Sequence, residues 1–120
     1  MSDMFFWDTY AFFELLDKNT NYIKYVGNKG ITTIFNLAEL NYNLKKEFSK
    51  SKADEITKFV SNMVVDVSTE DIIEACDLKK KNRQLSLPDC IGYSIAKRAG
   101  AKFLTGDKEF EKMKNVEFVK

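Results

Sequence analysis

Short apolar runs alternate along the chain with longer segments whose apolar residues recur at helical spacing. The runs predict strands at residues 4–8, 31–34, 64–67, 102–107 and 116–119. The segments between them predict helices at residues 9–17, 22–26, 35–48, 52–63, 69–81 and 86–100. Strands separated by helices imply right-handed crossovers and a mostly parallel sheet with helices on both faces. The pattern therefore predicts an α/β fold with four or five strands.

Several helix ends carry their own signals. Ser68 or Thr69 is suited to cap the helix that runs to about Lys81. Pro88 stands near the first turn of the next helix and Gly100 at its end, which is the usual placement of these two residue types.

Length and composition predict one globular domain over residues 1–120, since 44% of the residues are hydrophobic and 31% are charged. No apolar run approaches the roughly 18 residues that a membrane span needs. The first ten residues also lack the features of a secretory signal, so we expect a cytoplasmic protein with no membrane association. The cysteines, Cys76 and Cys90, are too few for a disulfide framework and are predicted to be small reduced core residues.

The net charge is only +1, and there is no histidine. Lysine and arginine cluster at 45–46, 50–52, 79–83 and 97–98. If several acids gather at one site, the remaining surface is more basic than the total suggests, which permits a polyanionic partner. Solvated helix faces are the ordinary explanation of each cluster.

Acidic residues occur where predicted strands end and where predicted helices begin. Asp8 ends the first strand and Asp107 ends the strand that starts at residue 102. Asp89 opens the helix that leads into that same strand, and Glu39 lies just over one turn into the helix that leaves residues 31–34. Ligands of parallel sheets bind beyond the carboxyl ends of the strands. We therefore expect these side chains to meet at one edge of the sheet.

Carboxylates held close together repel one another unless a cation neutralises them. Mg²⁺ and Mn²⁺ prefer oxygen ligands, and a chain without histidine can readily build an all-oxygen site. Each acid also has an ordinary explanation: Asp8, Asp89 and Asp107 could cap helices or turns. Glu39 could be a solvated glutamate, although Phe35 and Tyr42 beside it suggest a second packed helix face.

The order of these motifs resembles that of a PIN domain, the metal-dependent nuclease fold of VapC-type toxins and their relatives. The matching elements are Asp8-Thr9 after the first strand, Glu39-Leu40, the segment 88–96 and the segment 105–110. The resemblance implies a three-layer α/β/α fold with strand order 3-2-1-4-5. It also implies acids that bind one or two Mg²⁺ or Mn²⁺ ions and hydrolyse phosphodiester bonds, usually of RNA.

Residue by residue, the resemblance assigns metal binding and catalysis to four acids: Asp8, Glu39, Asp89 and Asp107. It makes Thr9, Thr105 and Glu109 auxiliary residues. The chain departs from the family at Tyr10, where many members have Asn, and at Asn36, where Ser or Thr is frequent. Glu109 replaces a more usual Asp.

The function implied is that of a Mg²⁺- or Mn²⁺-dependent endoribonuclease, the toxin of a VapBC-type pair with a VapB-type antitoxin as partner. Metal-activated water would attack the phosphodiester. Lys97, Arg98 and Lys108 are the candidate contacts to the RNA backbone. The alternatives are an inactive PIN-fold module that binds RNA, a processing nuclease without an antitoxin, and a phosphoryl-transfer domain of receiver or dehalogenase type.

Aromatic residues are unusually numerous near the amino terminus, and more follow in the next helices. They are Phe5, Phe6, Trp7, Phe12, Phe13, Tyr22, Tyr25, Phe35 and Tyr42. Either all of them are core or some form an interface. Because members of the family usually form two-fold pairs, we expect a homodimer with an apolar, helical interface that leaves the acidic sites open.

Overall fold

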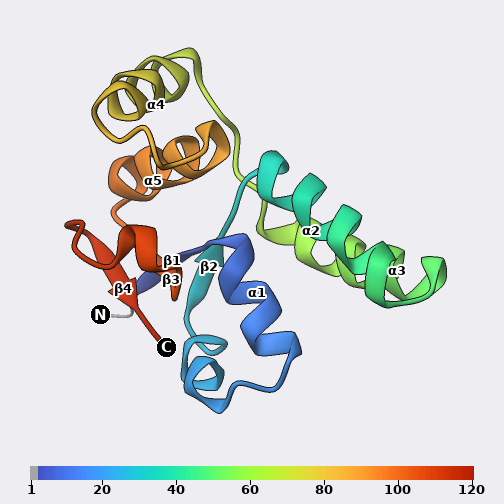
Figure 1. The fold of residues 1–120 in the computed structure, drawn as a ribbon. Helices are drawn as coiled ribbons and strands as arrows, with labels where there is room; N and C mark the ends of the chain where they lie inside the picture. The colour runs from blue at the N-terminus through green and yellow to red at the C-terminus, as the bar shows by residue number, and fades with distance from the viewer. Residues whose placement is uncertain (1–2) are drawn as a thin grey trace.

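The computed structural model describes residues 3–120 and contains a four-stranded parallel sheet (Figure 1). The strands are β1 (Met4–Trp7), β2 (Lys29–Ile31), β3 (Lys102–Thr105) and β4 (Val116–Phe118), in the order β2-β1-β3-β4. In the central register Phe6 is opposite Ile31 of β2 and Phe103 of β3. The α/β class and the parallel sheet predicted from the sequence are confirmed.

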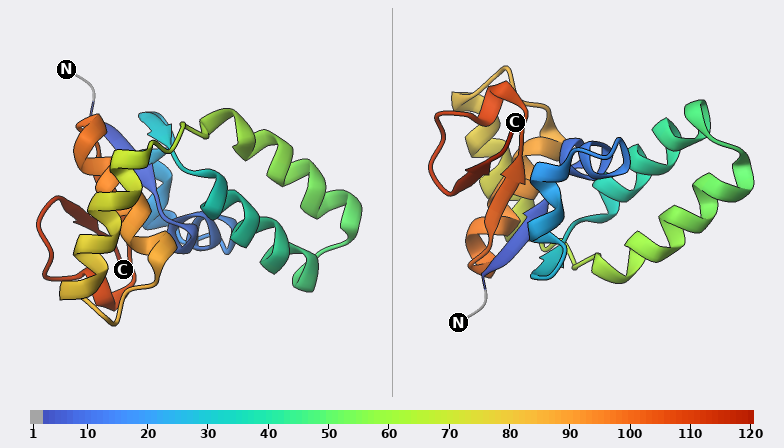
Figure 2. Two further views of the ribbon diagram at one scale, coloured as in Figure 1. Left: turned by 90° about the horizontal axis from the view of Figure 1, so that it is seen from above. Right: turned by 90° about the horizontal axis from the view of Figure 1, so that it is seen from below.

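Helices form a layer on each face of the sheet. They are α1 (Thr9–Leu16), α2 (Ile34–Glu47), α3 (Lys50–Val60), α4 (Thr69–Lys81) and α5 (Leu87–Ala99), with short 3₁₀ helices η1 (Thr20–Tyr25), η2 (Ser61–Met63) and η3 (Lys108–Phe110). Helices α4 and α5 lie on one side, and α2 and α3 form an antiparallel hairpin that extends away from the sheet (Figures 1 and 2). Among residues 3–120, none of these helices combines the length and apolarity needed to cross a membrane.

The central strands are apolar because both of their faces are covered. Phe6 stacks on Phe103, with 5.4 Å between ring centroids, in the core beneath α4 and α5. Phe5 and Trp7 point to the other core, which α1, η1, α2 and α3 complete. Gly92 lets α5 approach closely, since a Cβ there would stand 2.8 Å from the Phe6 ring.

The strand expected at residues 64–67 is reduced to a single parallel bridge between Val64 and Thr32, at the outer side of β2. Two backbone hydrogen bonds join the segments, Thr32 N–H to Met63 O and Val65 N–H to Thr32 O. The chain then turns toward α4, whose N-cap is Ser68. The sheet therefore follows the expected order 3-2-1-4-5, with a single bridge at residue 64 in the place of the expected third strand and four strands in the other places.

Three further expectations need correction. Cys90 is buried as predicted, but Cys76 is exposed on α4, and both are free thiols. Most of the supposed aromatic surplus is core: Phe5, Phe6, Trp7, Phe12, Tyr22 and Tyr25 are all buried. Phe35 and Tyr42 are exposed, so the second packed face expected beside Glu39 does not exist within the monomer.

Candidate functional site

Asp8 is a buried carboxylate at the carboxyl end of β1, with only 4% of its surface exposed. It is the N-cap of α1, and its Oδ1 accepts the Thr9 N–H at 2.9 Å. Its Oδ2 accepts the Thr105 hydroxyl at 2.8 Å. Burial raises the pKa of Asp8 to about 7; Asp89 and Asp107 add to the rise, while the Thr105 hydrogen bond opposes it. Asp8 is thus held rigidly in a place that disfavours its own charge.

Thr105, the last residue of β3, joins two of the predicted acids. While its hydroxyl donates to Asp8, the same oxygen accepts the N–H of Asp107 at 3.0 Å. Asp107 in turn caps η3 by accepting the Glu109 N–H at 3.0 Å with Oδ1. One hydroxyl thus connects the ends of two adjacent strands, while the auxiliary role of Thr105 in the site stays a prediction.

Asp89 lies in the first turn of α5 and forms a reciprocal capping box with Ser86. Its Oδ2 accepts the Ser86 N–H at 3.1 Å, and its own N–H donates to Ser86 Oγ at 3.2 Å. Burial is the main cause that raises the pKa of Asp89, and the charges of Asp107 and Glu39 raise it further. The hydrogen bonds from Ser86 act in the opposite direction.

These acids line one cavity of about 530 Å³. The complete lining is Asp8, Thr9, Tyr10, Phe13, Glu39, Asn43, Glu47, Ser86, Asp89 and Asp107. The residues come from the end of β1, from α1 and α2, from the start of α5 and from the end of β3. The structure therefore brings together the four acids that the sequence singled out, at the predicted edge of the sheet.

The donor set fits a hard divalent cation by its chemistry, because every candidate ligand atom is an oxygen. With the side chains as they stand, however, no three acidic, cysteine or histidine side chains within residues 3–120 are close enough together to hold one ion. Asp89 and Asp107 each direct one oxygen to a backbone N–H instead. A bound cation would share or compete for these carboxylate oxygens.

Thr9 and Asn36 form a buried polar network behind the acids. The Asn36 side-chain amide donates to Thr9 Oγ1 at 3.1 Å, and its Oδ1 accepts the Thr33 hydroxyl at 2.7 Å. The Thr9 hydroxyl proton is thereby directed away from Asn36. The departure from the family at Asn36 thus supplies a donor that fixes the Thr9 side chain.

The other predicted residues lie outside the cavity lining. Lys108 and Glu109 are exposed in η3, immediately after Asp107. Lys97 and Arg98 lie at the far end of α5, and Lys97 is about 12 Å along the helix axis from Asp89. Arg98 forms an ion pair with the buried carboxylate of Asp71, with 2.7 Å between Nε and Oδ1.

Sequence analysis missed several lining residues, although a signal for some of them was present. Glu39, Asn43 and Glu47 follow one another at intervals of four, which places them along one face of α2. Tyr10 and Phe13 are three residues apart on α1 and likewise share a face. Extending the α2 face from Glu39 in steps of four would have identified Asn43 and Glu47, but the same step from Asp8 leads to the core residue Phe12 and not to Tyr10 or Phe13.

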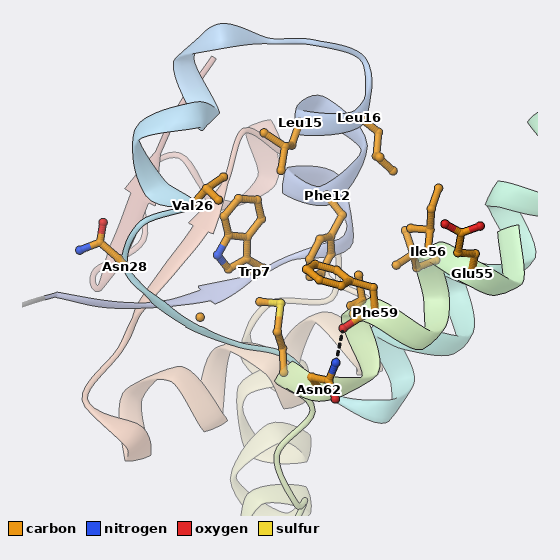
Figure 3. Close-up of a pocket in the computed structure, with 14 residues that line it drawn as sticks. Trp7, Phe12, Leu15, Leu16, Val26, Asn28, Glu55, Ile56, Phe59 and Asn62 are labelled. Carbon is orange, nitrogen blue, oxygen red and sulfur yellow. Dashed lines mark hydrogen bonds between the residues drawn. The ribbon is translucent and has the colours of Figure 1, made fainter. Parts of the chain in front are cut away.

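A second concave surface, the apolar groove, lies between α1 and the α2–α3 hairpin (Figure 3). Its volume is about 660 Å³, and its lining is Trp7, Phe12, Leu15, Leu16, Val26, Asn28, Gly30, Leu40, Glu55, Ile56, Phe59, Val60, Asn62 and Met63. Phe59 on α3 is 75% exposed at its rim. Isolated exposed apolar residues are ordinary, but a continuous apolar concavity is typical of a binding surface.

The fold and the acid-lined cavity together define the class of protein. The sequence pattern of the PIN domain matches residues 5–116, so the chain belongs to the PIN domain family. No protein with a curated description matches the chain.

Solved structures with the same fold include toxin–antitoxin complexes. One is a toxin-antitoxin complex from Klebsiella pneumoniae, with a TM-score of 0.75, 17% identity, and coverage of 97% of this chain and 96% of the other. Another is VapBC2 from Rickettsia felis bound to a DNA fragment from their promoter, with a TM-score of 0.74, 19% identity and 97% coverage of both chains. A third is PAE2754 from Pyrobaculum aerophilum, with a TM-score of 0.74, 21% identity, and coverage of 99% and 92%. At these identities the likeness concerns the fold.

Proposed function

We propose that this protein is a cytoplasmic, Mg²⁺- or Mn²⁺-dependent endoribonuclease that hydrolyses RNA phosphodiester bonds. The observation that carries the proposal is the convergence of four acids from separate elements on one cavity, with Asp8 buried and its pKa raised to about 7. A buried carboxylate beside two others is unfavourable in the free protein. A divalent cation would compensate for that cost.

The chain's own residues would bind and position the reactants. Asp8, Glu39, Asp89 and Asp107 supply oxygen ligands, and Thr105 and the Thr9 N–H hold Asp8 in place. When bound, Mg²⁺ or Mn²⁺ supplies a more acidic water and stabilises negative charge on the phosphate. The Thr9 side chain, held by Asn36, lies in the cavity lining and could donate to a phosphate oxygen.

Metal binding and cleavage can be measured separately. Titration calorimetry with Mn²⁺ should give saturable binding to the wild type, and thermal unfolding should shift upward as Mn²⁺ is added. A labelled single-stranded RNA should be cut in Mg²⁺ or Mn²⁺ and left intact in EDTA. Cleavage that persists in EDTA would contradict the proposal and indicate a contaminating nuclease.

The second candidate function is an RNA-binding module without catalysis. The present separation of the carboxylates favours it, since no three of the acids are placed to hold one ion. The same experiments distinguish the two functions. RNA binding without cleavage, at Mn²⁺ concentrations that saturate the protein, would support the module and exclude the nuclease.

We further propose that the partner is an antitoxin of the VapB type, and that one of its amphipathic segments occupies the apolar groove. The solved structures described above as toxin–antitoxin and VapBC complexes support a partner of this kind. The groove matches the apolar face of a helix, because its lining is mostly aliphatic and aromatic with few polar residues. Co-expression with an antitoxin of the VapB type should yield a stable complex in which RNA cleavage is inhibited.

A homodimer built from helices is also proposed. Because most of the aromatic residues lie in the core, the support for this dimer is narrower and consists of the exposed Phe35 and Tyr42 on α2. Light scattering at micromolar concentration should give twice the monomer mass. A monomeric mass at high concentration would exclude the dimer.

A further inference from the structure

An aromatic wall stands beside the acids, and none of the roles assigned so far accounts for it. Tyr10 and Phe13 are one turn apart on α1 and both line the acid-lined cavity. Tyr10 is 36% exposed although it adjoins the buried Asp8, and Phe13 is half-buried. An aromatic pair held at the edge of a charged cavity presents apolar surface where a polar residue would be better solvated.

The Tyr10 ring is held in place from one edge. A Cβ on Gly106 would overlap the backbone oxygen of Val119, which requires glycine here, and would stand 2.7 Å from Tyr10 Cε1, which shows how closely the ring approaches this turn. The same Val119 oxygen accepts the Tyr22 hydroxyl at 2.6 Å. The backbone after β3 therefore positions the Tyr10 ring against the turn that carries Asp107.

The part of the cavity lining that belongs to α2 has a different character. There α2 presents Glu39, Asn43 and Glu47, two carboxylates and an amide. A nucleotide whose phosphate lies over the acids can bring its base to the aromatic pair on α1 or to the polar side chains on α2. The negatively charged wall offers no flat surface, whereas an aromatic ring can stack with any base.

We propose that Tyr10, with Phe13 beside it, is a stacking platform for a nucleobase next to the scissile phosphate, and so determines that the substrate is unpaired RNA. This inference rests on the proposed nuclease function. A base within a duplex is stacked on its neighbours and cannot reach the wall, whereas a loop or single strand can place one base there. The departure from the family at Tyr10 then adds a contact to substrate.

The test uses short single-stranded RNAs with 2-aminopurine at successive positions, because the fluorescence of this base is quenched when it stacks. Binding is measured in Ca²⁺, and cleavage is measured in parallel in Mn²⁺. The variants are Tyr10→Ala, Tyr10→Leu, Tyr10→Phe and Phe13→Ala. Tyr10→Leu keeps apolar bulk against Gly106 without an aromatic face. Phe48→Ala is the matched control, since Phe48 is 37% exposed at the end of α2 and lies outside the cavity lining.

We expect quenching at one position in the wild type and in Tyr10→Phe. Tyr10→Ala and Tyr10→Leu should lose it, and their affinity should fall roughly 10-fold. An RNA with an abasic site at that position should bind both the wild type and Tyr10→Leu equally weakly. Thermal unfolding identifies any variant that has failed to fold, and Tyr10→Leu then provides the result if Tyr10→Ala is lost.

Other outcomes overturn the inference in ways that can be told apart. RNA binding by Tyr10→Leu at wild-type strength, or an equal loss in Phe48→Ala, refutes stacking and leaves the nuclease proposal intact. Equal losses with normal and abasic RNA show that Tyr10 acts on the fold and not on a base. A wild-type protein that neither binds nor cuts any RNA refutes both proposals.

Discussion

The acid-lined cavity and the apolar groove share helix α1 but differ in the free-energy cost that each carries when it is empty. Thr9, Tyr10 and Phe13 of α1 face the cavity, whereas Phe12, Leu15 and Leu16 face the groove. In the cavity the cost is electrostatic, because carboxylates are buried near one another. In the groove it is hydrophobic, because apolar side chains are left in contact with water.

The comparison shows how one small fold can present two sites of opposite chemistry from the same helix. A ligand relieves each cost only if its chemistry is opposite to that of the site: a cation for the cavity and an apolar helix for the groove. Each ligand should stabilise the protein by mass action, and each should be indifferent to substitutions in the other site. The predictions below test this independence.

The largest expected effect is on cleavage. Asp8→Asn and Asp89→Asn keep the size of the side chain and can keep its capping hydrogen bonds, but each removes an anionic ligand. We expect the initial rate of RNA cleavage to fall at least ~100-fold in each variant, while antitoxin binding is unchanged.

The matched control for these variants is Glu70→Gln, at an exposed position in the first turn of α4. It loses a negative charge outside the cavity and should cleave at the wild-type rate. Full activity of Asp8→Asn or Asp89→Asn would show that the substituted carboxylate is not required for RNA cleavage.

The next effect concerns the pH dependence of folding in the absence of metal. The pKa of Asp8 is about 7 in the folded protein, against 3.8 when the carboxyl is exposed. Between pH ~4 and pH 7 the folded state keeps the Asp8 proton, which the unfolded state has released. The contribution of Asp8 to the free energy of unfolding is therefore fully present below pH ~4, and it is lost as the pH rises through 7. The loss amounts to as much as about 4 kcal/mol.

Urea unfolding in EDTA can measure this contribution in wild type and Asp8→Asn. Because asparagine does not titrate, the variant should equal the wild type near pH 4 and exceed it in stability at pH 8. Saturating Mn²⁺ should remove the difference by stabilising the wild type alone. Identical pH profiles in both proteins would show that Asp8 is not destabilised by burial.

The same contrast explains how much of the molecule could be predicted from its sequence. Asp8 and Asp107 were predictable because an acid that directly follows an apolar run in an alternating α/β pattern lies at a known edge of the sheet. Asp89 and its Ser86 capping partner follow from the start signal of one helix. These rules concern local sequence, and they located the acids from four separate segments.

The groove could not be predicted, because it depends on where the α2–α3 hairpin lies relative to α1. Leu40 and Leu44 recur at helical spacing and are fully buried, but Phe59 belongs to the same kind of helical pattern and is exposed. The 64–67 strand was overestimated for a similar reason: three valines favour a strand, yet the sheet edge and the turn toward α4 leave room for one bridge only. Tertiary placement, which spacing does not encode, decides both cases.

A smaller effect is expected at the groove. Phe59→Asp places a charge on its apolar rim, so antitoxin binding should weaken by about 10- to 100-fold. Stability should change little because Phe59 is 75% exposed, and RNA cleavage by the free protein should be unaffected.

The matched control for the groove is Ile73→Asp, which introduces the same charge at a position that is 56% exposed on α4, away from the groove. Calorimetry with the purified antitoxin measures both variants. A reduced affinity in Ile73→Asp alone would show that the antitoxin binds the α4 surface and does not occupy the groove.

The smallest expected effect separates the basic residues that were candidates for RNA contact. Lys108 directly follows Asp107, whereas Lys97 is about 12 Å along α5 from Asp89, beyond the ~8 Å screening length at physiological salt. Lys108→Ala should therefore weaken RNA binding a few-fold. The slope of log affinity against log salt concentration should become less steep by about one, and both changes should be smaller for Lys97→Ala. Fluorescence anisotropy at several salt concentrations measures both quantities.

Arg98 is unsuitable for this test because it also neutralises the buried Asp71, so its removal changes stability as well. If Lys97→Ala had the larger effect on the salt dependence, the RNA backbone would run along α5 toward its carboxyl end, and the strand would extend well past the acid-lined cavity.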